Sequence, residues 1–533
     1  MNIETNNEII NVCEVIAKEK RNVIVEGELV VPDIKPDILS IADIDGDVFI
    51  TKREIKDGRL YIEGSADISA IYLAEDEKTS IRSLNNMFNF YETVDVHGIN
   101  EGSIIEIQAV KNQIEYKVLN GRKMSVRIPV LLIVVVRNNC EHTFVREISD
   151  DRNVEVLSKE IEFSNLVSSK SQDIEVNETI TLGQENLPIS EILKANIKVI
   201  NPDYKISYNK ILAKADAIIK IIYISDSENQ SIETFEGIIP VMGFINYDDL
   251  NESSNVKLEF NIKSFTLRPI YQDLKSMSCS VESEMEVKAD IYKQNKIAVI
   301  SDLYDPDINL NCTYENVSII SDLINVGENV ELVQGLMIPE LDDIKILTIN
   351  ATPTINNKNI LDGKIAVEGN VVFDILYYNE AKKIIENKKV DLPYQQVLKV
   401  HEIKGNMDVD VNVTSDNIEY RKVDSSQIQI KVNMNFNVTV KEEMMIEGVN
   451  SITVLDSQIE ETPSIVIYYV KPNDSLWKIA KNYRSTVAEI KEYNMLKDDL
   501  IFPNQQLIIP KRSKKMPVEI LWYVRAFWNK KVK

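Results

Sequence analysis

The side chains that most often carry catalysis or bind metals are few in this 533-residue chain and lie far apart. Its three histidines, His97, His142 and His401, lie far apart in the sequence, with neither an HxH nor an HExxH spacing. Isolated histidines of this kind are more often structural or surface residues than metal ligands or bases. The histidines therefore predict no metal centre.

The cysteines and the nucleotide-binding motifs point the same way. Cys13, Cys140, Cys279 and Cys312 form no CxxC pair, which predicts neither a disulfide framework nor a zinc site and favours a reducing compartment. A nucleophilic Cys–His pair would require long-range folding. No GxxxxGK[ST] motif occurs, so we expect no ATP hydrolysis by the chain itself. The acidic stretch AEDEK at 74–78 is more typical of a solvated loop than of a loose cation site. We expect no catalytic residue, no metal and no cofactor.

A compact group of site-like residues lies near the C-terminus, in KPNDSLWKIA and LIFPNQQLIIP. The run IVIYYV at 465–470 predicts a strand, and NDS then offers an N-cap for a helix. The apolar residues of that helix fall at i, i+3, i+4 and i+7: Leu476, Ile479, Ala480 and Tyr483. The capping box TVAE at 486–489 opens a second helix, and QLIIP at 506–510 returns as a strand. The predicted order is βααβ.

This segment resembles a LysM domain. The residues that match the family pattern are Tyr468, Val470, Asp474, Ser475, Leu476, Ile479, Ala480, Asn494, Ile501, Pro503, Gln505, Leu507, Ile509 and Pro510. Asn473 and Asn504 stand where the family usually has glycine. Asparagine tolerates a left-handed backbone, so we expect the fold to be kept. The added side chains alter the loops that grip N-acetylglucosamine in the family, and we expect weak glycan binding or none.

The resemblance implies a partner- or glycan-binding surface on two loops. Its residues are Asn473, Asp474, Ser475, Trp477, Ile501, Phe502, Pro503 and Asn504. Trp477 has two interpretations, because it lies off the predicted apolar face of the first helix. It is either a half-buried packing residue or an exposed aromatic anchor beside the groove, of the kind enriched in binding hot spots.

Period-2 alternation of apolar residues dominates positions 20–445, as in QIQIKVNMNFNVTV, and predicts half-buried strands. The segment DGRLYIEGSADISAIYL at 57–73 is similar to DGKIAVEGNVVFDILYY at 362–378, and a weaker copy lies at 209–224. Gly64, Ala215 and Gly369 are 151 and 154 residues apart, and each stands eight residues before a tyrosine. A second anchor, Ile114, Phe265 and Ile418, repeats at 151 and 153 residues. This period predicts a tandem array of domains, because solenoid repeats are much shorter.

The predicted fold class is mostly β, with three tandem antiparallel domains, sandwiches or open barrels, that each fold independently. The predicted domains are residues 1–150, 151–305 and 306–447, a linker at 448–463, the LysM domain at 464–511 and a basic aromatic tail at 512–533. Boundaries near 150 and 305 are placed in polar, acid-rich stretches that are typical of linkers.

Three such repeats followed by one LysM domain resemble the SPOCS-plus-LysM spore coat morphogenetic proteins of anaerobic spore-formers. PDIKPDIL at 32–39, together with DGRLYIEG, carries the SPOCS part of the resemblance. The resemblance implies a non-enzymatic scaffold in the mother-cell cytosol, at the forespore surface. It also implies that the LysM domain binds a SpoIVA-like coat ATPase, the protein that polymerises as the basement layer of the coat. Other coat proteins are further expected partners.

The charge distribution limits other partners. A formal net charge of −24 disfavours nonspecific binding of the body to nucleic acid or to an anionic membrane. The segment 511–533, in contrast, holds eight Lys or Arg residues against one Glu and two of the three tryptophans. As a basic aromatic helix it would lie on an anionic membrane, dock on an acidic partner or pack on the chain's own acidic body.

Two rival functions remain from the sequence. A cell-wall protein whose LysM domain holds peptidoglycan would have to be exported, and the first 22 residues lack a basic n-region and a cleavage site, so we expect a cytoplasmic, non-secreted protein. A hydrolase targeted by a LysM domain would need a catalytic constellation, which the sequence does not offer. The longest apolar run, at 128–136, is too short to span a bilayer as a helix and predicts a buried strand.

Overall fold

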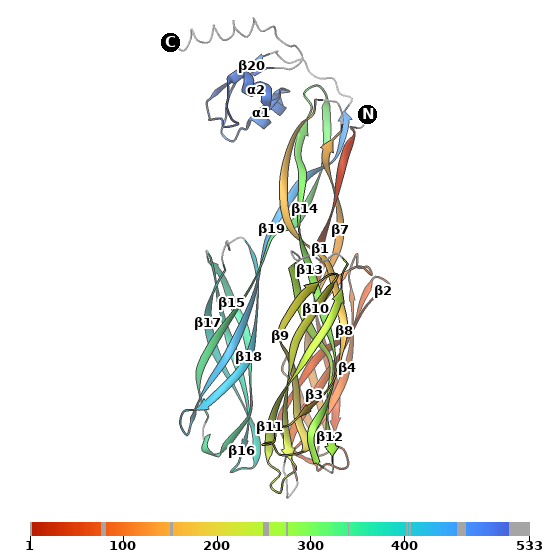
Figure 1. Ribbon diagram of the computed structural model, residues 1–533, viewed down its shortest axis with the longest axis vertical. Coiled ribbons are helices and arrows are strands. Elements are labelled where there is room, and N and C mark those ends of the chain that lie inside the picture. Colours follow the sequence, from red (N-terminus) through yellow and green to blue (C-terminus); the bar gives the residue numbers. More distant parts are fainter. Residues whose placement is uncertain are drawn as a thin grey trace.

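The computed structural model describes residues 3–75, 81–149, 153–248, 255–272, 275–338, 341–361, 363–400, 403, 407–455 and 465–510. Antiparallel strands make up three successive repeats, and a small module with two helices follows them (Figure 1). Neither α1 (Leu476–Tyr483) nor α2 (Val487–Asn494), the two α-helices of the described chain, has the length and apolar character needed to span a bilayer.

The strands of the three repeats correspond to one another in order, with β5 and β6 of the first repeat together in the place of a single strand in the other two. The first repeat contains β1 (Thr5–Val30), β2 (Ile38–Lys56), β3 (Arg59–Ala74), β4 (Ile81–Asp95), β5 (Ile104–Lys111), β6 (Glu115–Asn120) and β7 (Lys123–Ile148). The second contains β8 (Glu155–Thr181), β9 (Ile189–Ser207), β10 (Lys210–Ser225), β11 (Ile232–Asn246), β12 (Asn255–Gln272) and β13 (Lys275–Tyr304). The third contains β14 (Asn309–Met337), the 3₁₀ turn η1 (Leu341–Asp343), β15 (Ile344–Leu361), β16 (Lys364–Asn379), β17 (Ile384–Lys399), β18 (Asp408–Lys422) and β19 (Gln427–Leu455).

Each repeat is a sandwich of two sheets. Strands two to four form a meander, as in β2-β3-β4, while the long first strand pairs with the long last strand, as β1 does with β7. A single bridge, Ile320 to Ser164, joins β14 to β8, so that the second and third repeats share one six-stranded sheet.

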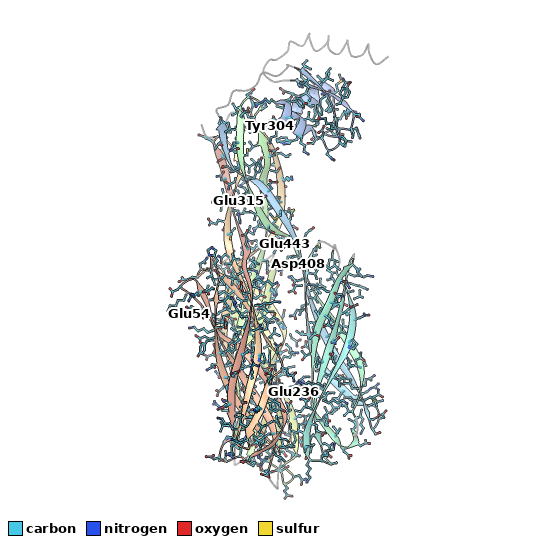
Figure 2. The ribbon with its side chains drawn as sticks, turned by 180° about the vertical axis from the view of Figure 1, so that it is seen from behind. Glu54, Glu236, Tyr304, Glu315, Asp408 and Glu443 are labelled. Carbon is cyan, nitrogen blue, oxygen red and sulfur yellow. The ribbon has the colours of Figure 1, made fainter. Side chains whose placement is uncertain are left out.

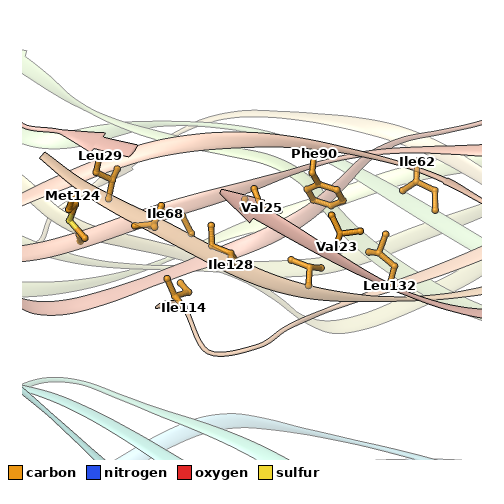
Figure 3. Packing of buried hydrophobic residues seen from close by; sticks show 14 of the residues in the cluster. Val23, Val25, Leu29, Ile62, Ile68, Phe90, Ile114, Met124, Ile128 and Leu132 are labelled. Atoms are coloured by element: carbon orange, nitrogen blue, oxygen red, sulfur yellow. The ribbon is translucent and has the colours of Figure 1, made fainter. Parts of the chain in front are cut away.

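The alternating sequence explains the core of each sandwich. In β7, every second residue from Ile128 to Val136 is fully buried, as the predicted buried strand requires. These side chains meet Val23, Val25 and Leu29 of β1 and Phe90 of β4 (Figure 3). The repeat tyrosines are also part of the cores: Tyr72 and Tyr223 are buried, and each donates its hydroxyl at 3.0 Å to a carbonyl 36 residues earlier.

The three repeats meet around a pseudo-three-fold axis. One shared apolar cluster takes the same four positions from every repeat, which means that equivalent surfaces face a common centre. The four sets are Ala42, Leu193 and Leu347; Ile71, Ile222 and Leu376; Leu73, Ile224 and Tyr378; and Ile81, Ile232 and Ile385.

The ends of the long strands continue past the sandwiches as a narrower bundle, which we call the stem (Figure 1). Its core again takes equivalent residues from each repeat, for example Val145, Ile300 and Val449. The repeats therefore share buried apolar surface, a feature that the expectation of independently folding domains did not include.

The predicted boundaries near 150 and 305 fall between strands, because β7 ends at Ile148 and β13 ends at Tyr304. They remain predictions as domain limits. The predicted linker at 448–463 needs a correction: residues 448–455 complete β19, where they pair with the start of β14 in the stem. The predicted tail, 512–533, lies outside the described residues.

Candidate functional site

The C-terminal module has the predicted βααβ order. It consists of β20 (Ile465–Tyr469), α1 (Leu476–Tyr483), α2 (Val487–Asn494) and β21 (Gln506–Pro510), and β20 pairs with β21. The Ser475 hydroxyl caps α1 by accepting from the Lys478 N–H at 3.2 Å, and the Thr486 hydroxyl caps α2 by accepting from the Glu489 N–H at 3.1 Å. Ser475 of the predicted site thus has a structural role.

Two loops form one end of the module, and both carry asparagine in a left-handed conformation. The φ angle is 69° at Asn473 and 65° at Asn504, the region that glycine usually occupies. The loops are tied together through Val470, whose carbonyl accepts from the Asn504 N–H at 2.7 Å and whose N–H donates to the Gln505 carbonyl at 2.9 Å. The backbone of the family pattern is kept, with two added side chains exposed to solvent.

Asp474 closes the first loop. Its carboxylate accepts from the Tyr468 hydroxyl at 2.7 Å and from the Lys471 N–H at 2.8 Å. The hydrogen bond from Tyr468 lowers the pKa of Asp474, and the same bond raises the pKa of Tyr468 to about 12. This carboxylate is therefore held by the loop it stabilises and has no role as a titrating group near neutral pH.

The exposed apolar surface of these loops comes from the second one. Phe502 is 60% exposed and Leu500 is 62% exposed, while Ile501 between them is half-buried in the core of the module. Pro503 and Asn504 are also exposed. A hydrogen bond from the Phe502 N–H to the Gln505 side chain, at 2.8 Å, fixes the turn that presents the phenyl ring.

Trp477 faces the other way, toward the stem. Its indole N–H donates to the Asp302 carboxylate at 2.8 Å, and its ring meets Tyr304 edge to face with centroids 5.0 Å apart. Lys481 adds an ion pair with Asp302 at 2.5 Å. Burial raises the pKa of Asp302, but the hydrogen bonds from Lys481 and Trp477 outweigh it, and the pKa is lowered overall. Of the two interpretations of Trp477, the half-buried packing residue describes its place in the structure.

The contact between stem and module, which we call the seat, has a second part. Tyr304 lies in the module's own apolar cluster and donates its hydroxyl to the Ser485 carbonyl at 2.8 Å (Figure 2). Arg484 donates to the Pro306 carbonyl and to the Asn309 side chain. Asp302, Tyr304 and Asn309 were not among the predicted site residues, because SDLYDPDIN at 301–309 has the polar composition of a linker. Within this stretch, only Tyr304, a large aromatic residue between Asp302 and Asp305, indicated a buried contact.

His97, His142 and the four cysteines form no metal site in the part of the chain that the structure describes. His142 lies in the stem between Glu315, at 2.7 Å, and Glu14, at 3.1 Å, and so links the first and third repeats. His97 is exposed, and His401 lies outside the described residues. The four cysteines are unpaired, and the described part of the chain shows no cluster of three metal-binding side chains.

Comparison with known proteins gives two family matches. The family described as SipL, SPOCS domain matches residues 37–119, 188–270 and 344–423, and the family described as LysM domain matches residues 468–510. Each SPOCS match starts within one residue of the start of the first meander strand and ends within two residues of the end of the penultimate strand of the repeat, so most of the stem lies outside the matches.

Among curated proteins, the chain is 52% identical over 40 residues to N-acetylmuramoyl-L-alanine amidase sle1 of Staphylococcus saprophyticus. That match covers 8% of this chain and only 12% of the amidase. No solved structure matches the chain.

Proposed function

We propose that this chain, which belongs to the proteins that combine SipL SPOCS domains with a C-terminal LysM domain, is a scaffold for assembly of the spore coat. SPOCS and LysM domains are non-catalytic binding domains, and this combination indicates a protein of sporulation that acts through protein–protein contacts. The finer proposal is that the LysM domain binds a SpoIVA-like coat ATPase, and that the chain works in the mother-cell cytosol at the forespore surface.

One observation carries this proposal: the LysM domain is seated on the stem by one face and presents another. Trp477 and Tyr304 close the seat, whereas the loop with Leu500 and Phe502 faces solvent. An exposed phenylalanine on a turn fixed by hydrogen bonds is a good interface anchor, because little conformational freedom is lost when it is buried.

The partner surface that we propose is therefore the second loop, with Phe502 as its anchor and Ile501, Pro503 and Asn504 as its frame. The first loop, with Asn473 and Asp474, lies beside it through the Val470 hydrogen bonds. Trp477 contributes indirectly, since it holds the domain in place on the stem.

An affinity pull-down from sporulating cells tests the proposal. The full chain should capture the coat ATPase, and a chain without residues 464–511 should not. Phe502→Ala should reduce capture by roughly thirtyfold or more, the cost of a hot-spot residue. Phe502 is exposed, so this variant should keep its thermal unfolding midpoint. Capture of the ATPase at parent affinity by the folded Phe502→Ala chain would reject the proposed surface.

Peptidoglycan binding is the alternative function, and the retained left-handed backbone at Asn473 and Asn504 is the observation that favours it. Calorimetry with a pentamer of N-acetylglucosamine distinguishes the two. We expect little or no heat of binding, because the asparagine side chains add bulk where a sugar ring would approach the loops. Tight, saturable binding that is lost in Asn504→Lys would support the wall-binding function instead.

A further inference from the structure

Each meander has two edge strands, and the last of them, β4, β11 or β17, differs among the three repeats. β4, β11 and β17 each pair with a single strand in the part of the chain that the structure describes, and no strand is paired with their other sides. β4 also lies near β1, where Phe88 meets Gly27, and near β9, where the Ser83 hydroxyl donates to the Ile192 carbonyl. Such edges can pair with another chain, and proteins commonly block them with proline or charged residues.

Two of the three edges are blocked at one equivalent position. Pro240 of β11 lies opposite Asp216, and Pro393 of β17 lies opposite Asn370, which are the same place in the repeat. Proline has no N–H to offer a docking strand. β17 also carries Lys388, Lys389 and Asp391 ahead of its proline. In β4 the equivalent residue is Asn89, opposite Ser65, and it keeps its N–H.

Three backbone N–H groups of β4 point away from its partner strand β3, toward the side where another strand could pair. The Met87 N–H donates at 3.0 Å to the side chain of its neighbour Asn86, and not to a strand. Alternate residues of an antiparallel strand point their N–H groups to the same side, so Asn89 and Tyr91 face this open edge as well. Met87 is 45% exposed and Tyr91 is 70% exposed.

The edge is also uncharged, in a protein of strongly acidic composition. Residues 83–91, SLNNMFNFY, hold no charged side chain, whereas charged residues make up 27% of the chain. A second copy would therefore meet no like charge along this stretch, despite the net charge of −24.

The sequence of this stretch is complementary to itself. In an antiparallel pairing of two copies centred on Asn89, Met87 of one copy faces Tyr91 of the other, and the two Asn89 side chains face each other. Methionine and tyrosine make favourable sulfur–aromatic contacts, and paired amides can hydrogen-bond. Glu92 would face Asn86, so the first acidic residue beyond the stretch meets no carboxylate. Such a two-fold interface is self-complementary, as a closed dimer requires.

We propose that two copies of this chain pair through their β4 edges, residues 85–93, into an antiparallel dimer. This proposal does not depend on the LysM partner, since β4 belongs to the first repeat and the seat of the LysM domain lies at the far end of the stem (Figure 1).

Sedimentation equilibrium of the full chain tests the proposal. The parent chain should approach twice the monomer mass as its concentration rises. Asn89→Pro, which installs the residue found at the equivalent positions of the other two repeats, should weaken association at least tenfold, and Met87→Asp should act in the same direction. Asn89→Thr keeps the N–H and serves as the matched control, with association close to that of the parent.

Far-UV circular dichroism and the thermal midpoint verify that each variant is folded. A parent chain that stays monomeric at all concentrations overturns the proposal, even if the edge then binds an extended peptide from another protein. A folded Asn89→Pro chain that dimerises as tightly as the parent overturns it as well.

Discussion

Gly64 of β3 lies directly opposite Phe90 of β4, and the phenyl ring occupies the space that a Cβ at residue 64 would fill. The third repeat has the same arrangement, with Tyr394 covering Gly369. The glycine of the repeat signature is therefore a packing requirement: an aromatic side chain on the edge strand covers a bare stretch of the central strand.

Gly64→Ala should lower the free energy of unfolding by about 1–3 kcal/mol, because the added methyl overpacks the site against Phe90 and the Phe49 carbonyl. Urea unfolding followed by circular dichroism measures the change. The second repeat supplies the control, since it has Ala215 opposite Val241. The double variant Gly64→Ala, Phe90→Val reproduces that pair and should recover part of the loss. A double variant no more stable than the single one would contradict this account.

A buried ion cluster connects the three repeats. Lys194 of the second repeat is 6% exposed and contacts Asp43 at 3.1 Å and Asp45 at 2.9 Å, both in the first repeat. Asn387 of the third repeat donates to Asp43 at 2.8 Å. Lys194→Met leaves Asp43 without the Lys194 ammonium and leaves Asp45 with Lys111 alone, at 2.8 Å, so we expect a loss of about 3–5 kcal/mol in the free energy of unfolding.

The control for that variant is Lys220→Met. Lys220 pairs with Glu236 on the surface of the second repeat, and both side chains are about half exposed. A surface ion pair contributes about 1 kcal/mol or less, so this variant should unfold almost as the parent does. Equal effects of the two substitutions would show that the buried cluster does not stabilise the assembly of repeats.

The same cluster predicts a dependence of stability on pH. Burial alone would raise the pKa of Asp45. The charges of Lys194 and Lys111 have the larger effect, so the pKa lies well below its ordinary value. A carboxyl group with a depressed folded-state pKa stabilises the fold above its unfolded pKa of about 3.9, and this stabilisation is lost as the pH falls below it. The parent chain should therefore lose stability steeply from about pH 5 downward, and Lys194→Met should lose less over the same range. Parallel pH profiles for the two proteins would contradict the assignment.

Cleavage between repeats should leave the fragments associated. A protease site placed at residues 150–152 opens the chain between β7 and β8, at a predicted boundary, but the shared clusters around the axis and in the stem keep the repeats together. Size-exclusion chromatography of the cleaved chain should give a single peak at the position of the intact chain. Separate elution of the first repeat would restore the expectation that the domains fold independently.

The sequence predicted what depends on local pattern. Strand alternation and the caps at Ser475 and Thr486 follow from neighbouring residues, the period near 150 residues follows from comparing one segment with another, and the structure shows all three. The pseudo-three-fold assembly depends on which apolar face of each repeat meets the next, and alternation is the same for a face buried within a sandwich and a face buried between repeats.

The seat of the LysM domain could not be predicted from the sequence either. Its contacts join residues more than 170 positions apart, such as Trp477 and Asp302, and the segment 302–309 has a linker's composition. The family pattern identifies the fold of the LysM domain, and it contains no information about the surface of the preceding repeat on which that domain rests.

Trp477→Phe should loosen the seat and leave partner capture intact. The phenyl ring can still pack on Tyr304, but Asp302 loses the indole N–H, and a hydrogen bond to a charged group contributes about 1.5–3 kcal/mol. Hydrogen exchange followed by mass spectrometry should show faster exchange in α1 and in residues 302–309, with the strands of the sandwiches unchanged. Phe502→Ala is the matched control: it should show parent exchange at the seat and weakened capture of the coat ATPase. If Trp477→Phe exchanges like the parent at 302–309, the stem contact does not hold the LysM domain. If it abolishes capture while the domain stays folded, Trp477 is itself the partner's anchor, and the seat must open before the partner binds.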